Sequence, residues 1–166
     1  MPVPHPDPDS RSVACAVVTV SDTRTPQTDR SGRLIQQLLQ ASSHHIVDYR
    51  LVKDEPQQIQ PLLQTLGETA EAIIFTGGTG IAPRDTTYDA IAPLLNKALP
   101  GFGELFRQLS YAEIGSRAMA SRATAGTYGS TLVFVLPGSS NAVRLAMEAL
   151  ILPELQHLTS QIQGKR

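Results

Sequence analysis

The chain has 166 residues, of which 41% are hydrophobic, and its formal net charge is −1. This length and composition suffice for one domain with a full hydrophobic core. A charge so close to zero gives no general attraction to nucleic acid or to an anionic membrane, so we expect neither as a partner. Any anionic ligand would have to be held by locally placed Lys and Arg side chains.

The N-terminal residues 1–11 are expected to form a disordered tail, because four prolines fall within the first eight residues. No basic start with an apolar stretch marks a signal peptide, and no apolar run could span a bilayer, which favours a cytoplasmic location. Cys15 is the single cysteine, so no intrachain disulfide can form, and we expect a buried, inert thiol. The four histidines lack ligand spacing. We therefore expect one domain over residues 12–163.

Residues 13–20 form a continuous apolar and β-branched run, which predicts a strand buried on both faces. A polar loop over residues 21–31 leads into an amphipathic helix, and residues 46–52 predict the second strand. Asp54 could cap the next helix, whose first turn holds Pro56. The residues expected on the buried faces of these two helices are Leu34, Ile35, Leu38 and Leu39, and then Ile59, Leu62, Leu63 and Leu66.

Residues 72–76 predict a third strand that runs into a glycine-rich loop. A helix follows with Thr87 as a possible cap, and we expect Pro100-Gly101 to end it. Apolar residues at helical spacing over residues 102–109 indicate another helix. The residues that support these two helices are Ile91, Leu94 and Leu95, expected to face inward, and then Phe102, Leu105, Phe106 and Leu109.

Residues 121–128 and 131–136, separated by Gly129-Ser130, predict a hairpin. Pro137-Gly138-Ser139 then opens the C-terminal helices. Strands alternating with helices predict an α/β fold, a three-layer αβα sandwich with a mainly parallel sheet and one antiparallel hairpin. The residues expected to face inward from the last helices are Val143, Ala146, Met147, Leu150, Leu155, Leu158 and Ile162.

Ligands of such sheets bind at the carboxyl ends of the strands, where we expect four loops to meet. These loops are Ser21-Asp22-Thr23, Lys53-Asp54-Glu55, Gly77–Asp85 and Pro137-Gly138-Ser139. The third is the most informative, because glycines can adopt φ > 0 and converge backbone N–H groups on a phosphate. A purely structural βα turn is the alternative. A Walker A loop is excluded because no lysine follows Gly80, and the dinucleotide fingerprint lacks its third glycine.

Hard carboxylate oxygens beside a phosphate loop are what Mg²⁺ needs, since it usually takes one or two carboxylates together with substrate phosphates and water. A magnesium-nucleotide site is therefore a hypothesis. Structural roles are the alternatives: Asp54 as a helix cap, Asp85 as a partner of Arg84 and Asp22 as a turn former. The charged side chains expected around the loop are Lys53, Arg84 and Arg122, and Asp22, Asp54 and Asp85.

Six short motifs in a fixed order carry a family resemblance. They are Thr19-Val20-Ser21-Asp22-Thr23-Arg24, Asp29-Arg30-Ser31-Gly32, Thr76-Gly77-Gly78-Thr79-Gly80 with Pro83-Arg84-Asp85-x-Thr87, Pro100-Gly101-Phe102-Gly103-Glu104, Ser121-Arg122-Ala123 and Leu136-Pro137-Gly138-Ser139. With them the chain resembles, over about residues 12–163, the MogA/MoaB-type molybdenum-cofactor biosynthesis proteins. The G domain of gephyrin and its plant counterpart belong to the same family.

The resemblance implies molybdopterin adenylyltransferase activity, in which the terminal phosphate of molybdopterin attacks the α-phosphate of Mg-ATP and pyrophosphate leaves. Asp54 and Asp85 match the family's two functional aspartates, so it implies that they are catalytic and hold Mg²⁺. The other residues that it assigns to the nucleotide, its phosphates or the pterin are Ser21, Asp22, Gly77, Gly78, Thr79, Gly80, Arg84, Thr87, Ser121, Arg122, Pro137, Gly138 and Ser139.

The resemblance also implies a homo-oligomer, a trimer or a hexamer, with residues 100–109 near the site. A protein that inserts molybdate is a further expected partner. The chain departs from many adenylyltransferase members at Val135, where they carry Asn, and at Ser140, where Pro is frequent. Two other functions stay open: a non-catalytic molybdopterin-binding or scaffold protein of the same pathway, and a nucleotide pyrophosphatase.

Overall fold

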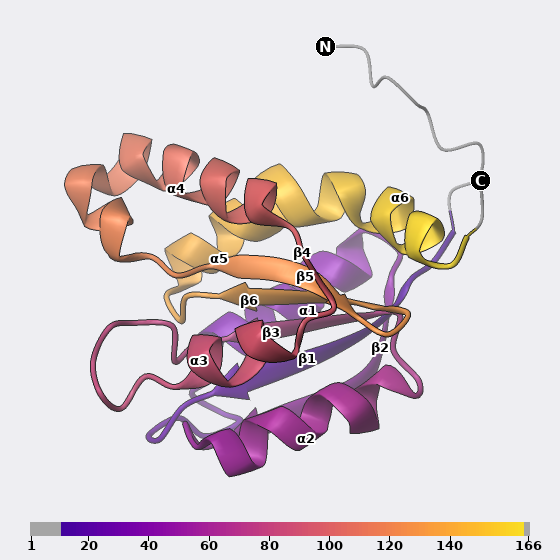
Figure 1. The fold of residues 1–166 in the computed structure, drawn as a ribbon, viewed down its shortest axis with the longest axis horizontal. Helices are drawn as coiled ribbons and strands as arrows, with labels where there is room; N and C mark the ends of the chain where they lie inside the picture. The colour runs from indigo at the N-terminus through magenta and orange to yellow at the C-terminus, as the bar shows by residue number, and fades with distance from the viewer. Residues whose placement is uncertain (1–10, 165–166) are drawn as a thin grey trace.

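The computed structural model describes residues 11–164 and shows a six-stranded sheet between two layers of helices (Figure 1). The order of strands across the sheet is β2-β1-β3-β6-β5-β4. The first four are parallel, β5 is antiparallel to β6, and β4 is antiparallel to β5. The strands are β1 (Ala14–Val20), β2 (His45–Val52), β3 (Ala72–Thr76), β4 (Lys97–Ala98), β5 (Thr124–Tyr128) and β6 (Thr131–Leu136). The predicted fold class and hairpin are confirmed.

The two faces of the sheet are covered by different helices, because side chains alternate between the faces along each strand. Ile74 of β3 packs in the core formed with α1, α4, α5 and α6, whereas Ile73 and Phe75 pack in the core formed with α2 and α3. Burial on both faces explains the uninterrupted apolar runs of the central strands. The helices are α1 (Arg30–Ala41), α2 (Pro56–Gly67), α3 (Thr87–Ile91), α4 (Pro100–Ile114), α5 (Ser140–Ala146) and α6 (Leu152–Ile162).

The segment after the glycine loop differs from the prediction. The helix α3 ends at Ile91, a single 3₁₀ turn follows, and the short edge strand β4, which was not predicted, comes before Pro100. Pro100 begins α4 instead of ending the previous helix, because a missing N–H group is harmless in a first helical turn. Leu94, predicted to face inward, is 39% exposed.

Both ends of the described chain are attached to the carboxylate of Glu71, since Arg11 and Gln163 each donate a hydrogen bond to its Oε1. Arg11, which the sequence placed in the tail, donates from Nη1 to Glu71 Oε1 over 2.6 Å and from Nη2 to Thr159 Oγ1 over 2.8 Å. Residues 1–10 of the predicted tail lie outside the described residues. The thiol of Cys15 is buried as predicted, and burial raises its pKa to about 12. Within residues 11–164, none of the helices has both the length and the apolar character that crossing a membrane requires.

Candidate functional site

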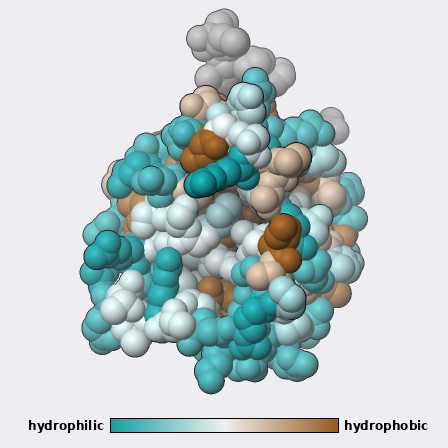
Figure 2. Space-filling view, turned by 90° about the vertical axis from the view of Figure 1, so that its left-hand side faces the viewer, coloured by the Kyte–Doolittle hydropathy of each residue, from teal (hydrophilic) through white to brown (hydrophobic). Residues whose placement is uncertain are grey.

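A pocket of about 630 Å³ lies at the carboxyl ends of the parallel strands. Figure 2 looks onto this end of the molecule, where pale residues surround a hollow edged by hydrophilic side chains. Loops that follow β1, β2, β3 and β6 line one part of the pocket, and α4 with the turn after it lines the other. The four predicted loops therefore meet, although of the second only Asp54 lines the pocket.

The glycine loop needs its glycines for two separate reasons. Gly77 and Gly78 have φ values of 97° and 66°, in the left-handed region that L side chains rarely adopt. There is also no space for a side chain at Gly77, because its Cβ would overlap the carbonyl oxygen of Val20, at the end of β1. Gly80 has no positive φ, but a Cβ there would lie 2.6 Å from Asp85 Oδ2. The loop thus packs tightly against strand β1 and Asp85.

Asp54 is 6% exposed, and only one of its two carboxylate oxygens is engaged. Oδ1 accepts hydrogen bonds from the backbone N–H and the hydroxyl of Thr86, over 2.9 and 2.6 Å. Oδ2 accepts none from the residues described. The alternative role of Asp54 as a helix cap is wrong, since Glu55 precedes α2 and no side chain caps that helix.

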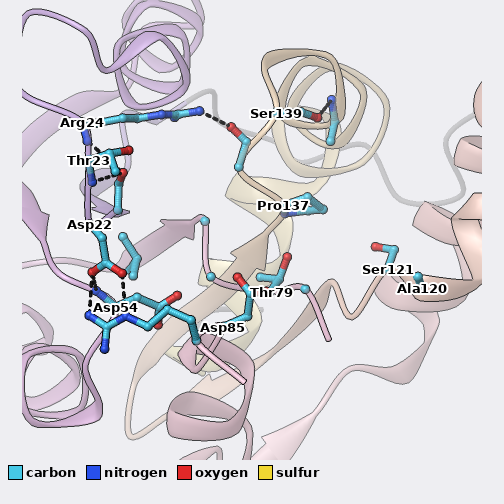
Figure 3. A pocket seen from close by; sticks show the side chains of 18 of the residues that line it. Asp22, Thr23, Arg24, Asp54, Thr79, Asp85, Ala120, Ser121, Pro137 and Ser139 are labelled. Atoms are coloured by element: carbon cyan, nitrogen blue, oxygen red, sulfur yellow. Dashed lines mark hydrogen bonds and ion pairs between the residues drawn. The ribbon is translucent and has the colours of Figure 1, made fainter. Parts of the chain in front are cut away.

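Asp85 lines the same part of the pocket and is not the partner of Arg84. Its Oδ2 accepts a hydrogen bond from the N–H of Ala82 over 3.3 Å. Arg84 instead forms a bidentate ion pair with Asp22, with Nε 2.7 Å from Oδ2 and Nη2 3.0 Å from Oδ1. In Figure 3 the three carboxylates lie on one side of the pocket and Ser121 on the opposite side.

Hydrogen bonds hold the loops after β1 and β6 together above the glycine loop. Arg24 donates from Nη1 to Ser31 Oγ over 2.9 Å and from Nη2 to the carbonyl of Gly138 over 3.0 Å. Ser21 Oγ accepts from the N–H of Arg24, and Ser139 Oγ caps α5 by accepting from the N–H of Ala142. Arg24 was not assigned a role from the sequence, although it ends the first family motif.

Two predicted binding residues lie behind the glycine loop and do not line the pocket. Arg122 donates to the carbonyl oxygens of Thr79 and Gly80 over 3.2 and 2.6 Å, and pairs with Asp89 at 3.0 Å. Its guanidinium therefore anchors the loop from outside. The other is Thr87, whose Oγ1 is buried without a hydrogen-bond partner among the described residues. Lys53 does not line the pocket either.

The wall formed by α4 and the following 3₁₀ turn was expected only in part: the family resemblance placed residues 100–109, which include Phe106, near the site, but none of the wall residues was named as a site residue. The residues that it contributes to the pocket are Phe106, Ser110, Ile114, Arg117 and Ala120. The only signal in the sequence was the family motif that begins at Pro100. Val135, the departure from the family pattern, is fully buried in the core under α2 and α3 and does not line the pocket.

Carboxylate oxygens of the type that Mg²⁺ takes lie at one end of the pocket. Asp54 lines it, and the unpartnered Thr87 Oγ1 lies close to Asp54 Oδ2 but behind the glycine loop, because a Cβ added at Gly78 would overlap both oxygens. No group of three His, Cys, Asp or Glu side chains between residues 11 and 164 is arranged to hold a metal by itself. A metal here would have to take further ligands from a substrate and water, which is the usual mode for Mg²⁺.

Comparison with known proteins identifies the family. The profile of the family described as a probable molybdopterin binding domain matches residues 16–157. The chain belongs to this family. Molybdenum cofactor biosynthesis protein B of Bacillus subtilis (strain 168) is 54% identical over 154 residues, which cover 91% of each chain. The resemblance to MogA/MoaB-type proteins inferred from the motifs is thereby confirmed.

Solved structures agree with the family membership. A crystal structure of a molybdenum cofactor biosynthesis protein B matches with a TM-score of 0.90 and 49% identity, over 93% of this chain and 98% of that chain. The tungsten cofactor synthesizing protein MoaB from Pyrococcus furiosus matches with a TM-score of 0.84 and 35% identity, over 93% and 99%. The chain therefore has the MoaB fold over nearly its whole described length.

The close packing around Gly78 can be tested by comparing its substitution with that of a second glycine of positive φ. Gly129 also has a positive φ, of 57°, but nothing lies within 4 Å of its missing Cβ. We expect Gly129→Ala to lower the free energy of unfolding by about 1 kcal/mol, the strain of a left-handed residue. Gly78→Ala should lower it by roughly 1–3 kcal/mol more, because Cβ would press on Asp54 and Thr87. Urea unfolding measures both, and equal losses would contradict the close packing.

The Asp22–Arg84 pair predicts a pH dependence of stability. Hydrogen bonds from the Arg84 side chain, and then from the N–H of Asp54, lower the pKa of the Asp22 carboxyl. A lowered pKa means that the pair stabilises the fold above the ordinary Asp value of about 3.9 and loses this effect as the pH falls below it. Asp22→Asn should therefore reduce the melting temperature at pH 6, and the difference from the unsubstituted protein should shrink towards pH 3. A difference that stays constant would rule out the pair as its source.

Proposed function

We propose that this protein binds molybdopterin and transfers AMP from Mg-ATP to the terminal phosphate of that pterin. One observation carries the proposal: Asp54 and Asp85 line the pocket beside the glycine loop, and neither forms an ion pair with a basic side chain of the described residues. Unpaired carboxylates beside a loop of this kind suit a phosphate-transfer site that uses Mg²⁺. Membership in the molybdopterin-binding family supports molybdopterin as the acceptor.

In the proposed reaction, an oxygen of the terminal molybdopterin phosphate attacks the α-phosphorus of ATP. A new P–O bond forms there, the bond from the α-phosphorus to the β-bridging oxygen breaks, and pyrophosphate leaves. Such transfers need little covalent chemistry from the protein, so positioning and charge stabilisation provide most of the catalysis. The glycine loop would orient phosphate oxygens through N–H groups other than that of Gly77, which donates to the carbonyl of Leu136.

The carboxylates would have fixed orientations for this task. Thr86 holds Asp54 through two hydrogen bonds to Oδ1, which leaves Oδ2 available. The Ala82 N–H holds Asp85 by Oδ2. When held by Asp54 and Asp85, Mg²⁺ would neutralise part of the negative charge of the phosphates. These hydrogen bonds would fix the direction of both carboxylates before a substrate binds.

Asp85→Asn should abolish adenylyl transfer without unfolding the protein. The substitution removes a charge but little volume, and we expect a fall in turnover on the order of 100-fold or more. The matched control is Asp48→Asn, because Asp48 pairs with Arg50 on β2 outside the pocket. The assay follows adenylylated molybdopterin by mass spectrometry with purified protein, ATP and Mg²⁺.

Near-normal turnover of Asp85→Asn would contradict the role of Asp85. If the unsubstituted protein retains molybdopterin but forms no adenylylated product, the protein is instead a non-catalytic pterin-binding or scaffold member of the pathway. Hydrolysis of a nucleotide without any pterin would favour a nucleotide pyrophosphatase.

The proposal includes assembly into a trimer or a pair of trimers. An apolar groove of about 440 Å³ runs beside α4, and its lining includes Phe102 and Leu105, the latter 51% exposed. Phe106, in contrast, is buried in the core. A monomer would leave this apolar surface in water, whereas a second copy of the chain could cover it.

Light scattering at micromolar concentration should therefore give the mass of three or six chains. Leu105→Glu should lower the mass, because a charge would be buried in the contact, while Leu94→Glu, at a residue 39% exposed outside the groove, should not. A fully active protein with the mass of a single chain would refute the assembly.

A further inference from the structure

Three arginines line the pocket, and two of them are already engaged. Arg84 forms its bidentate pair with Asp22 and lies 3.7 Å from Glu55. Arg24 bonds to Ser31 and to the carbonyl of Gly138. An incoming anion would have to displace these partners before it could use either guanidinium. Neither arginine is therefore a freely available anion site.

The third arginine, Arg117, has a different environment. It lies in the 3₁₀ turn Gly115–Ala120, is exposed, and lines the pocket. Its guanidinium forms no ion pair or hydrogen bond with any side chain of the described residues. Five N–H donors of a guanidinium are thus available at the pocket wall.

The wall that carries Arg117 is held in place by other side chains. Arg107 Nη1 lies 3.4 Å from the carbonyl oxygens of both Ser121 and Ala123, directly after the turn. Arg122 connects the same segment to the glycine loop. These contacts hold the segment that directly follows the turn carrying Arg117.

The charges in the pocket are separated in space. Asp54 and Asp85 lie on one side, and Ser121, four residues after Arg117, lies on the opposite side (Figure 3). A ligand with anionic groups would be repelled by bare carboxylates at the first side and attracted at the second. The hydroxyl groups of Ser110 and Ser121 add donors to the second side.

We propose that Arg117 is the residue through which this pocket binds a phosphate group of its substrate. A guanidinium matches phosphate geometry with two parallel hydrogen bonds and stays charged at all relevant pH values. The identity of the phosphate rests on the proposed function: it belongs either to the nucleotide or to the pterin. Arg84 and Arg122, the other cations expected to serve there, each have protein partners in this structure, Asp22 for Arg84 and the glycine-loop carbonyls with Asp89 for Arg122.

The test compares Arg117→Gln, Arg117→Lys and the control Arg30→Gln by calorimetric titration with pyrophosphate, ATP and molybdopterin. Arg30 is exposed, lies at the start of α1 and does not line the pocket, so its substitution removes the same charge elsewhere. We expect Arg117→Gln to weaken binding of at least one probe by about tenfold or more, as for a lost charge-assisted contact. Arg117→Lys should recover part of the affinity, and Arg30→Gln should bind as the unsubstituted protein does.

The probes distinguish the source of the phosphate. Loss for ATP alone assigns Arg117 to the nucleotide, and loss for molybdopterin alone assigns it to the pterin phosphate. If Arg117→Gln binds every probe with an affinity within twofold of that of the unsubstituted protein, the proposal is overturned. It is also overturned if the unsubstituted protein binds none of the probes. The two proposals can fail separately. If pyrophosphate binding depends on Arg117 but the protein forms no adenylylated pterin, the role of Arg117 is supported and adenylyl transfer is contradicted.

Discussion

The site depends on how closely the chain passes the end of β1 when it leaves β3. Thr19, Thr76 and Leu136 are register partners across three adjacent parallel strands, so these strands end at the same level. Gly77 then turns with a positive φ against the carbonyl of Val20, and its N–H donates to Leu136 over 3.0 Å. No other residue type could pass there without overlap. This contact places the glycine loop directly beside the ends of β1 and β6.

Charge pairing decides which polar groups remain available at the pocket. Asp22 and Arg84 neutralise each other, and Asp22 also receives the N–H of Asp54, which links the loops after β1 and β2. Exposed ion pairs stabilise a protein little, so the main effect of this pair is geometric. Asp54 and Asp85 keep unpaired charges beside the glycine loop, and Arg117 keeps one in the turn after α4 that lines the other part of the pocket. A ligand with both metal-binding and anionic groups would match that separation.

The glycine loop and the α4 wall are connected from behind. Arg122 binds the carbonyl oxygens of Thr79 and Gly80, packs over the Tyr88 ring at 4.9 Å and pairs with Asp89. The same segment is held to α4 through Arg107. Both sets of contacts lie on the short segment that enters β5. This segment therefore links the two sides of the pocket.

The sequence by itself determined the fold class, the parallel strands and the family, because apolar runs, helical spacing and ordered motifs are local patterns. It also indicated that glycines of the loop could take φ > 0, which Gly77 and Gly78 do and Gly80 does not. Tertiary structure decided the partners of the charged residues. Arg84 meets Asp22 rather than its neighbour Asp85, and Asp54 meets Thr86 rather than the helix that follows it. Such pairings depend on which loops the sheet brings together, and adjacency in the chain does not specify them.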